Sequence, residues 1–358
     1  FPNIWQNRGI YMKKIIIAAI VAAAVIIAGI FIVLMSGGRP VDKTSEDIVV
    51  TAIPEGSGTI QIADILEENT LIEKPGVFRV LSKLYGYDGT YKAGTYGLSQ
   101  SMSMKQMMQM ISDGDTISHN FTVIEGQTVE KIAKNLDEAG IISYDEFMHE
   151  AQYGDFSTYD FLAGNERSMY RLEGFLYPDT YSFEEGSDAR TIIEAMLDHF
   201  KEMVTADIVE QAKASGHSLR DIVIAASIIE REAGIPEDMP LVSSVIYNRL
   251  DKGMALQMDS VVSYILQEDK VNLTYADIAV ESDYNPYKNT GLPPGPICSP
   301  GINAIKAAIS PAKTDYLYFV VSEKLDGSAA FSSDYNQFLK DKDAYYKAYQ
   351  KAESEKEN

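Results

Sequence analysis

Residues 222–234 read IVIAASIIEREAG. This apolar run ends in two carboxylates, Glu230 and Glu232, on either side of Arg231. The run predicts a buried helix whose end places an acid at the edge of a dry core. Burial disfavours the charged carboxylate and raises its pKa, as a general acid near neutral pH requires. The alternative is a plain core helix that ends in solvated charges, and these residues alone favour that alternative.

The flanking residues carry the start and stop signals of a helix. Ser218 is the expected N-cap, with Asp221 at the capping-box position. Gly234 is the expected C-cap, and Pro236 follows it closely. We therefore expect one helix between these signals, with Glu230 on its apolar side.

Composition limits the functional classes. The chain has 358 residues, 46% hydrophobic and 23% charged, which is enough for two or three domains with proper cores. Its formal net charge of -21 argues against a nucleic-acid partner, because phosphate binding needs a basic surface. Cys298 is the only cysteine, so no internal disulfide is expected. The four histidines show no ligand spacing, and neither a metal nor a cofactor is expected.

The N-terminal part predicts a membrane anchor. Residues 15–35 are uncharged and nearly all apolar, so a helix there spans a hydrocarbon core of roughly 30 Å. Arg8, Lys13 and Lys14 precede it, which predicts a cytoplasmic N-terminus and an extracytoplasmic remainder. A cleaved signal peptide is the alternative, but its apolar region is usually about 7–15 residues long. Met12 is the expected natural start, with residues 1–11 upstream of it.

Two segments of the first half resemble each other at an offset of about 70 residues. Each reads as a strand, a Glu-Gly turn (Glu55-Gly56 and Glu125-Gly126) and a short amphipathic helix. Small modules of this kind resemble LysM-like glycan-binding units, and a scaffold role is the alternative. The matched apolar positions include Ala63 with Ala133, Leu66 with Leu136, and Ile72 with Ile142.

In the second half, polar residues and a Pro-Gly loop interrupt the apolar helices. Residues 188–214, 261–267 and 303–309 predict helices, and residues 316–321 predict a buried strand. Rigid loops commonly build sites, and tyrosine rings suit sugars. The alternative is that these residues cap helices, as Asp259 and Ser260 would suit. The expected substrate-binding residues are Asn248, Arg249, Gln257, Asp259, Ser260, Tyr284, Asn285, Tyr287, Leu292, Pro293 and Pro294.

Seven ordered blocks carry a family resemblance. They are LEGFLYPDTY, IIEREAG, VIYNRL, GMALQMDS, YNPYKNTGLPPGPI, PGINAIKAAISP and KTDYLYFVV. Between about Val49 and Phe331 the chain resembles the MltG (YceG-like) family of endolytic murein transglycosylases. One departure stands out. Family members often carry Gly-x-His-x-Phe-Ser near the C-terminus, whereas residues 327–332 read GSAAFS, with Ala329 at the histidine position.

The resemblance implies non-hydrolytic cleavage of the MurNAc–GlcNAc β-1,4 bond within peptidoglycan strands. The products are 1,6-anhydro-MurNAc ends, and the reaction terminates nascent strands. It implies a catalytic glutamate in SIIERE, assigned to Glu230 with Glu232 as the second choice. It also implies work beside penicillin-binding proteins and the elongation machinery. The alternatives are a non-catalytic, membrane-anchored glycan-binding or scaffold protein, and a hydrolytic muramidase.

The expected fold class is α+β, with a transmembrane helix, LysM-like β-α modules and a mixed α/β catalytic domain. The expected organisation is a cytoplasmic segment 1–14, a membrane helix 15–36, a linker 37–48, repeat modules 49–118 and 119–185, a catalytic domain 186–335 and a charged tail 336–358.

Overall fold

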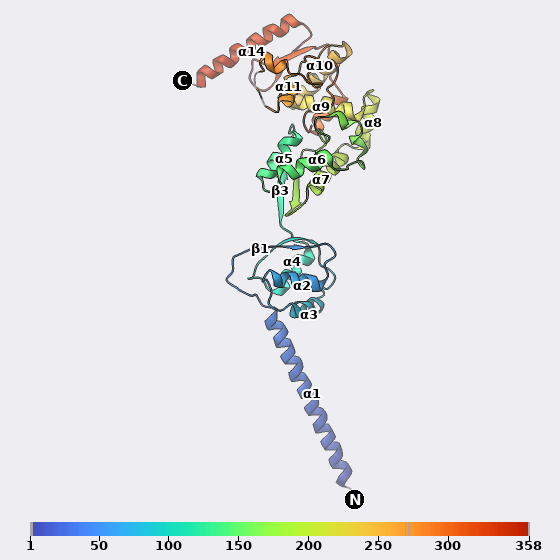
Figure 1. Cartoon of the computed structure of the whole chain (residues 1–358), viewed down its shortest axis with the longest axis vertical. Helices are drawn as coiled ribbons and strands as arrows, with labels where there is room; N and C mark the ends of the chain where they lie inside the picture. Colours follow the sequence, from blue (N-terminus) through green and yellow to red (C-terminus); the bar gives the residue numbers. More distant parts are fainter. Residues whose placement is uncertain (1–2, 269, 271–272, 357–358) are drawn as a thin grey trace. The chain divides into compact units, whose positions relative to one another are not determined.

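The computed structural model describes residues 3–268, 270 and 273–356. Backbone contacts divide the chain into two compact units. The first unit is Phe1–His119 with Glu184–Gly186, and the second is Asn120–Phe183 with Ser187–Asn358. The fold is mixed, and the described strands form three two-stranded sheets (Figure 1).

The first unit begins with a long apolar helix. Among the described residues, one helical segment, Met12–Gly29, is long and apolar enough to cross a membrane. Antiparallel pairing then joins β1 to β2, with Val49 opposite Leu98 and Ile53 opposite Gly94. The elements of the first unit are α1 (Asn3–Gly37), β1 (Val49–Ile53), α2 (Thr59–Glu68), α3 (Pro75–Tyr85), β2 (Gly94–Leu98) and α4 (Met104–Asp113).

The expected repeat is visible in the helices that follow the two Glu-Gly turns. In the first copy α2 follows β1, and in the second α5 (Val129–Glu138) follows β3 (Ser118–Thr122), which confirms the predicted order of strand, turn and helix. Helix α2 buries Ile62, Ala63 and Leu66. Helix α5 buries the matched residues Ile132, Ala133 and Leu136. Both copies therefore bury the same helical face.

The second unit contains one continuous hydrophobic core that runs from Phe121 to Ile309. This core includes the second repeat copy and crosses the domain boundary that the sequence placed after residue 185. Strand β3 pairs with β4, and β5 pairs with β6. The remaining elements are α6 (Tyr144–Tyr153), β4 (Thr180–Glu184), α7 (Ala189–Met203), α8 (Ala206–Ala214), α9 (Leu219–Glu232), α10 (Met239–Asp251), α11 (Asp259–Leu266), α12 (Tyr275–Ile278), α13 (Ile302–Ile309), β5 (Tyr318–Val321), β6 (Ala329–Ser332), α14 (Tyr335–Lys356) and the short 3-10 helices η1 (Asp160–Leu162), η2 (Asn165–Arg167) and η3 (Pro236–Asp238).

Helix α9 lies at the centre of this core, packed against α8, α10, α11 and α13 (Figure 1). Its N-cap is the predicted Ser218, whose hydroxyl accepts the Asp221 N–H at 3.1 Å. The predicted C-cap is wrong, because α9 ends at Glu232 and Ala233 is the capping residue. Gly234 serves another purpose: a Cβ there would lie 2.3 Å from the Gly327 carbonyl oxygen, so the two backbones touch.

Two other predicted elements differ from the structure. The helix expected over 188–214 is two helices, α7 and α8, because Thr205 between them has an extended backbone. The strand expected over 316–321 is shorter, and β5 is half-exposed because it pairs only with β6.

Candidate active site

The end of α9 presents the two candidate carboxylates at the border of the core. Residues 222–229 are buried, Glu230 and Glu232 are partly buried, and Arg231 is exposed. Burial is the largest cause that raises the pKa of the Glu230 carboxyl, and the same holds for the pKa of the Glu232 carboxyl. Both groups therefore tend to hold a proton at higher pH than an ordinary glutamate.

Glu230 faces the backbone that leads into α13. Its Oε2 accepts the Gly301 N–H at 2.9 Å, and Gly301 is the N-cap of α13. The carboxyl of Glu125 lies beside it, since a Cβ on Gly301 would be 2.4 Å from Glu125 Oε1. After burial, the Gly301 bond lowers the pKa of Glu230 and the charge of Glu125 raises it. Glu230 thus joins α9 to the start of α13.

Glu232 faces the start of α11. Its Oε1 accepts two hydrogen bonds from Ser260, one from the N–H at 3.2 Å and one from the hydroxyl at 2.6 Å. The alternative considered for Asp259 and Ser260, that one of them caps this helix, is not what the structure shows. Met258 is the N-cap and gives no side-chain bond, and Glu232 accepts the Ser260 N–H of the first turn instead.

Two further side chains complete what we call the Glu232 cluster: Glu232, Asp259, Ser260 and Tyr287. The Tyr287 hydroxyl donates a hydrogen bond to Asp259 Oδ1. The charge of Asp259 raises the pKa of Glu232, whereas Ser260 and the Arg231 guanidinium lower it. Four polar groups expected from the sequence to act on substrate therefore meet at one place.

Other expected binding residues hold the scaffold around this cluster. The Asn248 amide donates to the carbonyl oxygens of Thr314 and Tyr316, at 3.1 and 2.9 Å. Arg249 is buried, donates to the Leu317 carbonyl at 2.7 Å, and lies 5.4 Å from the Tyr318 ring centroid. Burial lowers the pKa of Arg249, and the nearby Glu232 charge raises it.

The Pro-Gly loop and its neighbours are also fixed by hydrogen bonds. The fully buried Asn285 donates to the Val280 carbonyl at 2.7 Å, and the Tyr284 hydroxyl accepts the Met169 N–H at 3.1 Å. Gln257 adopts φ 50° and its N–H donates to the Pro286 carbonyl. In the same loop, Leu292 is partly buried, Pro293 is buried, and the carbonyl of the partly buried Pro294 accepts a bond from Arg220.

Sequence reasoning missed Glu173, which lies in the LEGFLYPDTY block. Its carboxyl is 0% exposed and accepts the Val129 N–H and the Tyr264 hydroxyl, both at 3.1 Å. Burial raises its pKa from 4.5 to about 8. Glu173 stands alone before Gly174, and no pattern in the neighbouring sequence indicates that its carboxyl is buried. The group ties the start of α5 to α11.

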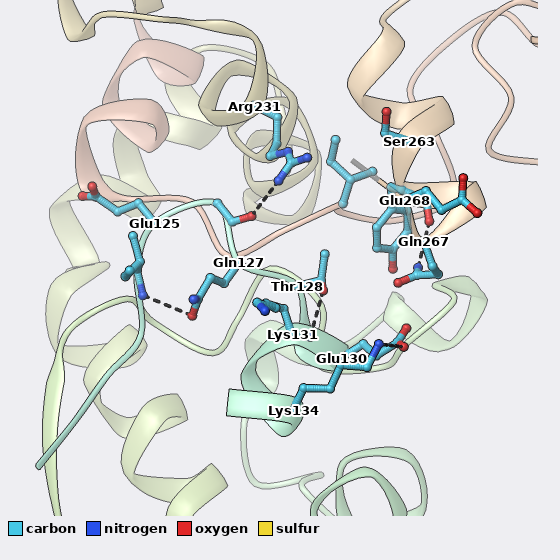
Figure 2. A pocket seen from close by; sticks show the side chains of 14 residues that line it. Glu125, Gln127, Thr128, Glu130, Lys131, Lys134, Arg231, Ser263, Gln267 and Glu268 are labelled. Carbon is cyan, nitrogen blue, oxygen red and sulfur yellow. Dashed lines mark hydrogen bonds and ion pairs between the residues drawn. The ribbon is translucent and has the colours of Figure 1, made fainter. Parts of the chain in front are cut away.

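A pocket of about 300 Å³ lies next to the end of α9. Figure 2 shows Arg231 on one wall and Lys131, Glu130 and Lys134 on the facing wall. Ser263 of α11 and Gln267, the C-cap of that helix, form a third side. Within the described residues, no group of three or more His, Cys, Asp or Glu side chains is arranged to hold a metal.

A sequence model described as the YceG-like family matches residues 51–344. The chain belongs to the YceG-like family. It is 35% identical over 320 residues to the endolytic murein transglycosylase of Bacillus subtilis (strain 168), covering 86% of this chain and 87% of that protein. It is 31% identical to the endolytic murein transglycosylase of Streptococcus pneumoniae serotype 2, covering 78% of this chain but only 55% of that longer protein. The crystal structure of a yceG-like protein from Listeria monocytogenes matches with a TM-score of 0.57 and 32% identity, covering 83% of this chain and 99% of that one.

This YceG-like chain has a structural use for the segment that lacks the histidine. Ala329 opens β6, and its N–H donates to Asp238 Oδ2 at 2.7 Å. Asp238 lies just before α10, so β6 is bonded to the turn that follows α9. The segment 327–332 therefore supports the end of α9 through its backbone.

Proposed function

We propose that this chain is an endolytic murein transglycosylase. It cleaves the MurNAc–GlcNAc β-1,4 bond within peptidoglycan strands without water and leaves 1,6-anhydro-MurNAc ends. Membership of the YceG-like family and the names of the two relatives support the reaction class. The observation that carries the proposal is the Glu232 cluster, in which a carboxyl whose pKa is raised by burial meets Asp259, Ser260 and Tyr287.

Glu232 is the better general acid of the pair, which reverses the order expected from the sequence. Its neighbours are polar side chains able to contact a sugar, whereas Glu230 contacts the backbone at Gly301 and the carboxyl of Glu125. Ser260 holds one oxygen of Glu232, and Oε2 accepts no hydrogen bond from any described residue. That oxygen is the one we assign to the glycosidic bond. Glu230 remains the second candidate.

The reaction balances with one carboxyl group. Protonated Glu232 gives its proton to the glycosidic oxygen as the C1–O bond of MurNAc breaks, and GlcNAc leaves with a free hydroxyl. The C6 hydroxyl oxygen of the same MurNAc then attacks C1, and its proton passes to the Glu232 carboxylate. The acid is restored and no water is consumed. The Asp259 carboxylate stabilises the positive charge that develops at C1.

One observation favours a second candidate, hydrolysis by a muramidase. A glycoside hydrolase usually needs two carboxyl groups, and Asp259 gives Glu232 such a partner. Mass analysis of digested, purified peptidoglycan distinguishes the two. Anhydro-MurNAc ends are expected, 18 Da lighter than reducing ends as the loss of one water requires. Reducing ends alone would replace the transglycosylase with a muramidase.

Paired variants test the choice of acid. Glu232→Gln is expected to lower kcat by about a hundred-fold or more, because glutamine cannot donate the proton. Glu230→Gln, the matched control two residues away, keeps an acceptor for the Gly301 N–H and is expected to lose less than about ten-fold. An active Glu232→Gln with an inactive Glu230→Gln would return the role to Glu230. Full activity in both variants would show that neither Glu232 nor Glu230 is the catalytic acid.

The cellular setting belongs to the same proposal. The segment Met12–Gly29 supports a membrane anchor, with the N-terminus in the cytoplasm and the residues after α1 outside. The repeat copies contact glycan, and penicillin-binding proteins and the elongation machinery are the proposed partners. Labelling of single cysteines placed in each half with a membrane-impermeant reagent tests the topology. Labelling of the N-terminus in intact cells would overturn it.

A further inference from the structure

The pocket beside α9 contains a cation that lacks a partner. Two of its carboxylates are already in ion pairs, Glu130 with Lys134 at 2.6 Å and Glu268 with Lys270 at 3.1 Å. The ammonium of Lys131 is exposed, and no described residue bonds or pairs with it. The third lining carboxylate, Glu125, lies beside Gly301, so an anion at Lys131 would meet an ammonium that no described residue pairs with.

Two further donors line the same space. The Arg231 guanidinium lies across the pocket from Lys131 (Figure 2). Gln127 uses its Oε1 to accept the Ile124 N–H at 3.2 Å, which leaves its amide NH₂ to donate. The Lys131 ammonium and the Gln127 amide around one space suit a carboxylate, because charge-assisted bonds to carboxylates are the strong ones.

The pocket lies within reach of the proposed acid. Ser260, which bonds Glu232, is near the start of α11, and Ser263 and Gln267 of the pocket follow about one and two turns later. One turn rises about 5 Å, so the pocket begins about 5 Å along the helix from the cluster. In peptidoglycan, MurNAc carries a short peptide on its C3 lactyl group, and this peptide has free carboxylates. A MurNAc held at Glu232 can place that peptide in the pocket.

We propose that this pocket binds a free carboxylate of the MurNAc-linked peptide, with Lys131 as the main contact. The enzyme then selects strands that still carry charged peptides. This inference rests on the proposed function, because it takes the substrate from it.

The test uses the full-length chain in detergent and teichoic-acid-free peptidoglycan in two forms. One form is native, and in the other the peptide carboxylates are converted to amides with carbodiimide and ammonia, which removes the charge and keeps the size. The proteins are the wild type, Lys131→Gln and Lys201→Gln. Lys201 is an exposed lysine of α7 outside the pocket and serves as the matched control.

We expect wild type and Lys201→Gln to have a KM about three-fold lower for native than for amidated strands, with kcat unchanged, as an exposed charge pair would give. Lys131→Gln is expected to raise KM for native strands by the same factor and to leave KM for amidated strands unchanged. Equal KM values of the wild type for both substrates would overturn this inference alone. A rise of KM for both substrates in Lys131→Gln would also overturn it, since that marks a structural role. Cleavage of neither substrate by the wild type would refute the proposed function instead.

Discussion

Replacing Glu173 by glutamine is expected to flatten the pH dependence of stability in the second unit. The carboxyl is fully buried, and its pKa is raised from 4.5 to about 8. A raised pKa means that the folded state keeps a proton that the unfolded state has lost. Stability from this group is therefore full below pH 4.5 and falls as the pH rises toward 8.

The size of the effect follows from the two pKa values. One unit of pKa shift corresponds to about 1.4 kcal/mol. Integrated between pH 5 and pH 8, the extra proton held by the folded state corresponds to about 3–4 kcal/mol of unfolding free energy, which the wild type loses over this range. Glutamine keeps an oxygen for the Val129 N–H and has no charge to lose, so the variant avoids this loss.

Cys298 provides the assay. It is the only cysteine, lies 0% exposed in the second unit, and its thiol is protected until that unit unfolds. Short pulses of an alkylating reagent at increasing urea, read by mass, give the unfolded fraction at each pH. Glu237→Gln, an exposed carboxylate of the same unit, is the control and should behave as the wild type. Equal pH slopes for the wild type and Glu173→Gln would refute the assigned pKa and the argument from burial.

Three further outcomes are expected. The kcat/KM of the wild type should fall as the pH rises through the raised pKa of Glu232, because the acid must be protonated, and a profile flat up to pH 9 would contradict this. Ser260→Ala removes a hydrogen bond that lowers this pKa, so the pH at which kcat/KM falls should move up, and an unmoved pH profile with lower kcat would show that Ser260 only packs the site. Gly234→Ala puts a Cβ 2.3 Å from the Gly327 carbonyl oxygen and should cost about 1–3 kcal/mol in the urea assay, whereas an unchanged midpoint would show that the contact yields freely.

Local patterns in the sequence predicted the parts of the fold that depend on neighbouring residues. Ser218 and Asp221 marked the start of α9, and the apolar run gave its buried length, because caps and periodicity act within one or two turns. The repeated helices were also found from matched apolar positions. The start of α11 was placed correctly to within two residues, but its cap was not.

The site depends on contacts between residues far apart in the chain, and these leave no local pattern. Ser260 suited an N-cap by type, yet the carboxyl that satisfies this turn comes from Glu232, 28 residues away. Glu173 is bonded by Tyr264, 91 residues later, and nothing around it in the sequence shows its burial. The family resemblance ranked Glu230 before Glu232, and only the tertiary neighbours of the two carboxyls give the reason to propose the reverse order.

The close approach of Gly234 and Gly327 also has a consequence for how the protein is made. The turn after α9 is fixed by that contact and by the bond from Ala329 to Asp238, both formed with a segment synthesised about ninety residues later. Translation proceeds at about 5–20 residues per second, so the residues that contact the turn after α9 are synthesised several seconds after α9 itself. A nascent chain that has reached only α13 has both carboxylates but lacks the strand that fixes the turn behind them. The emerging enzyme is therefore expected to stay inert toward the wall until synthesis is nearly finished.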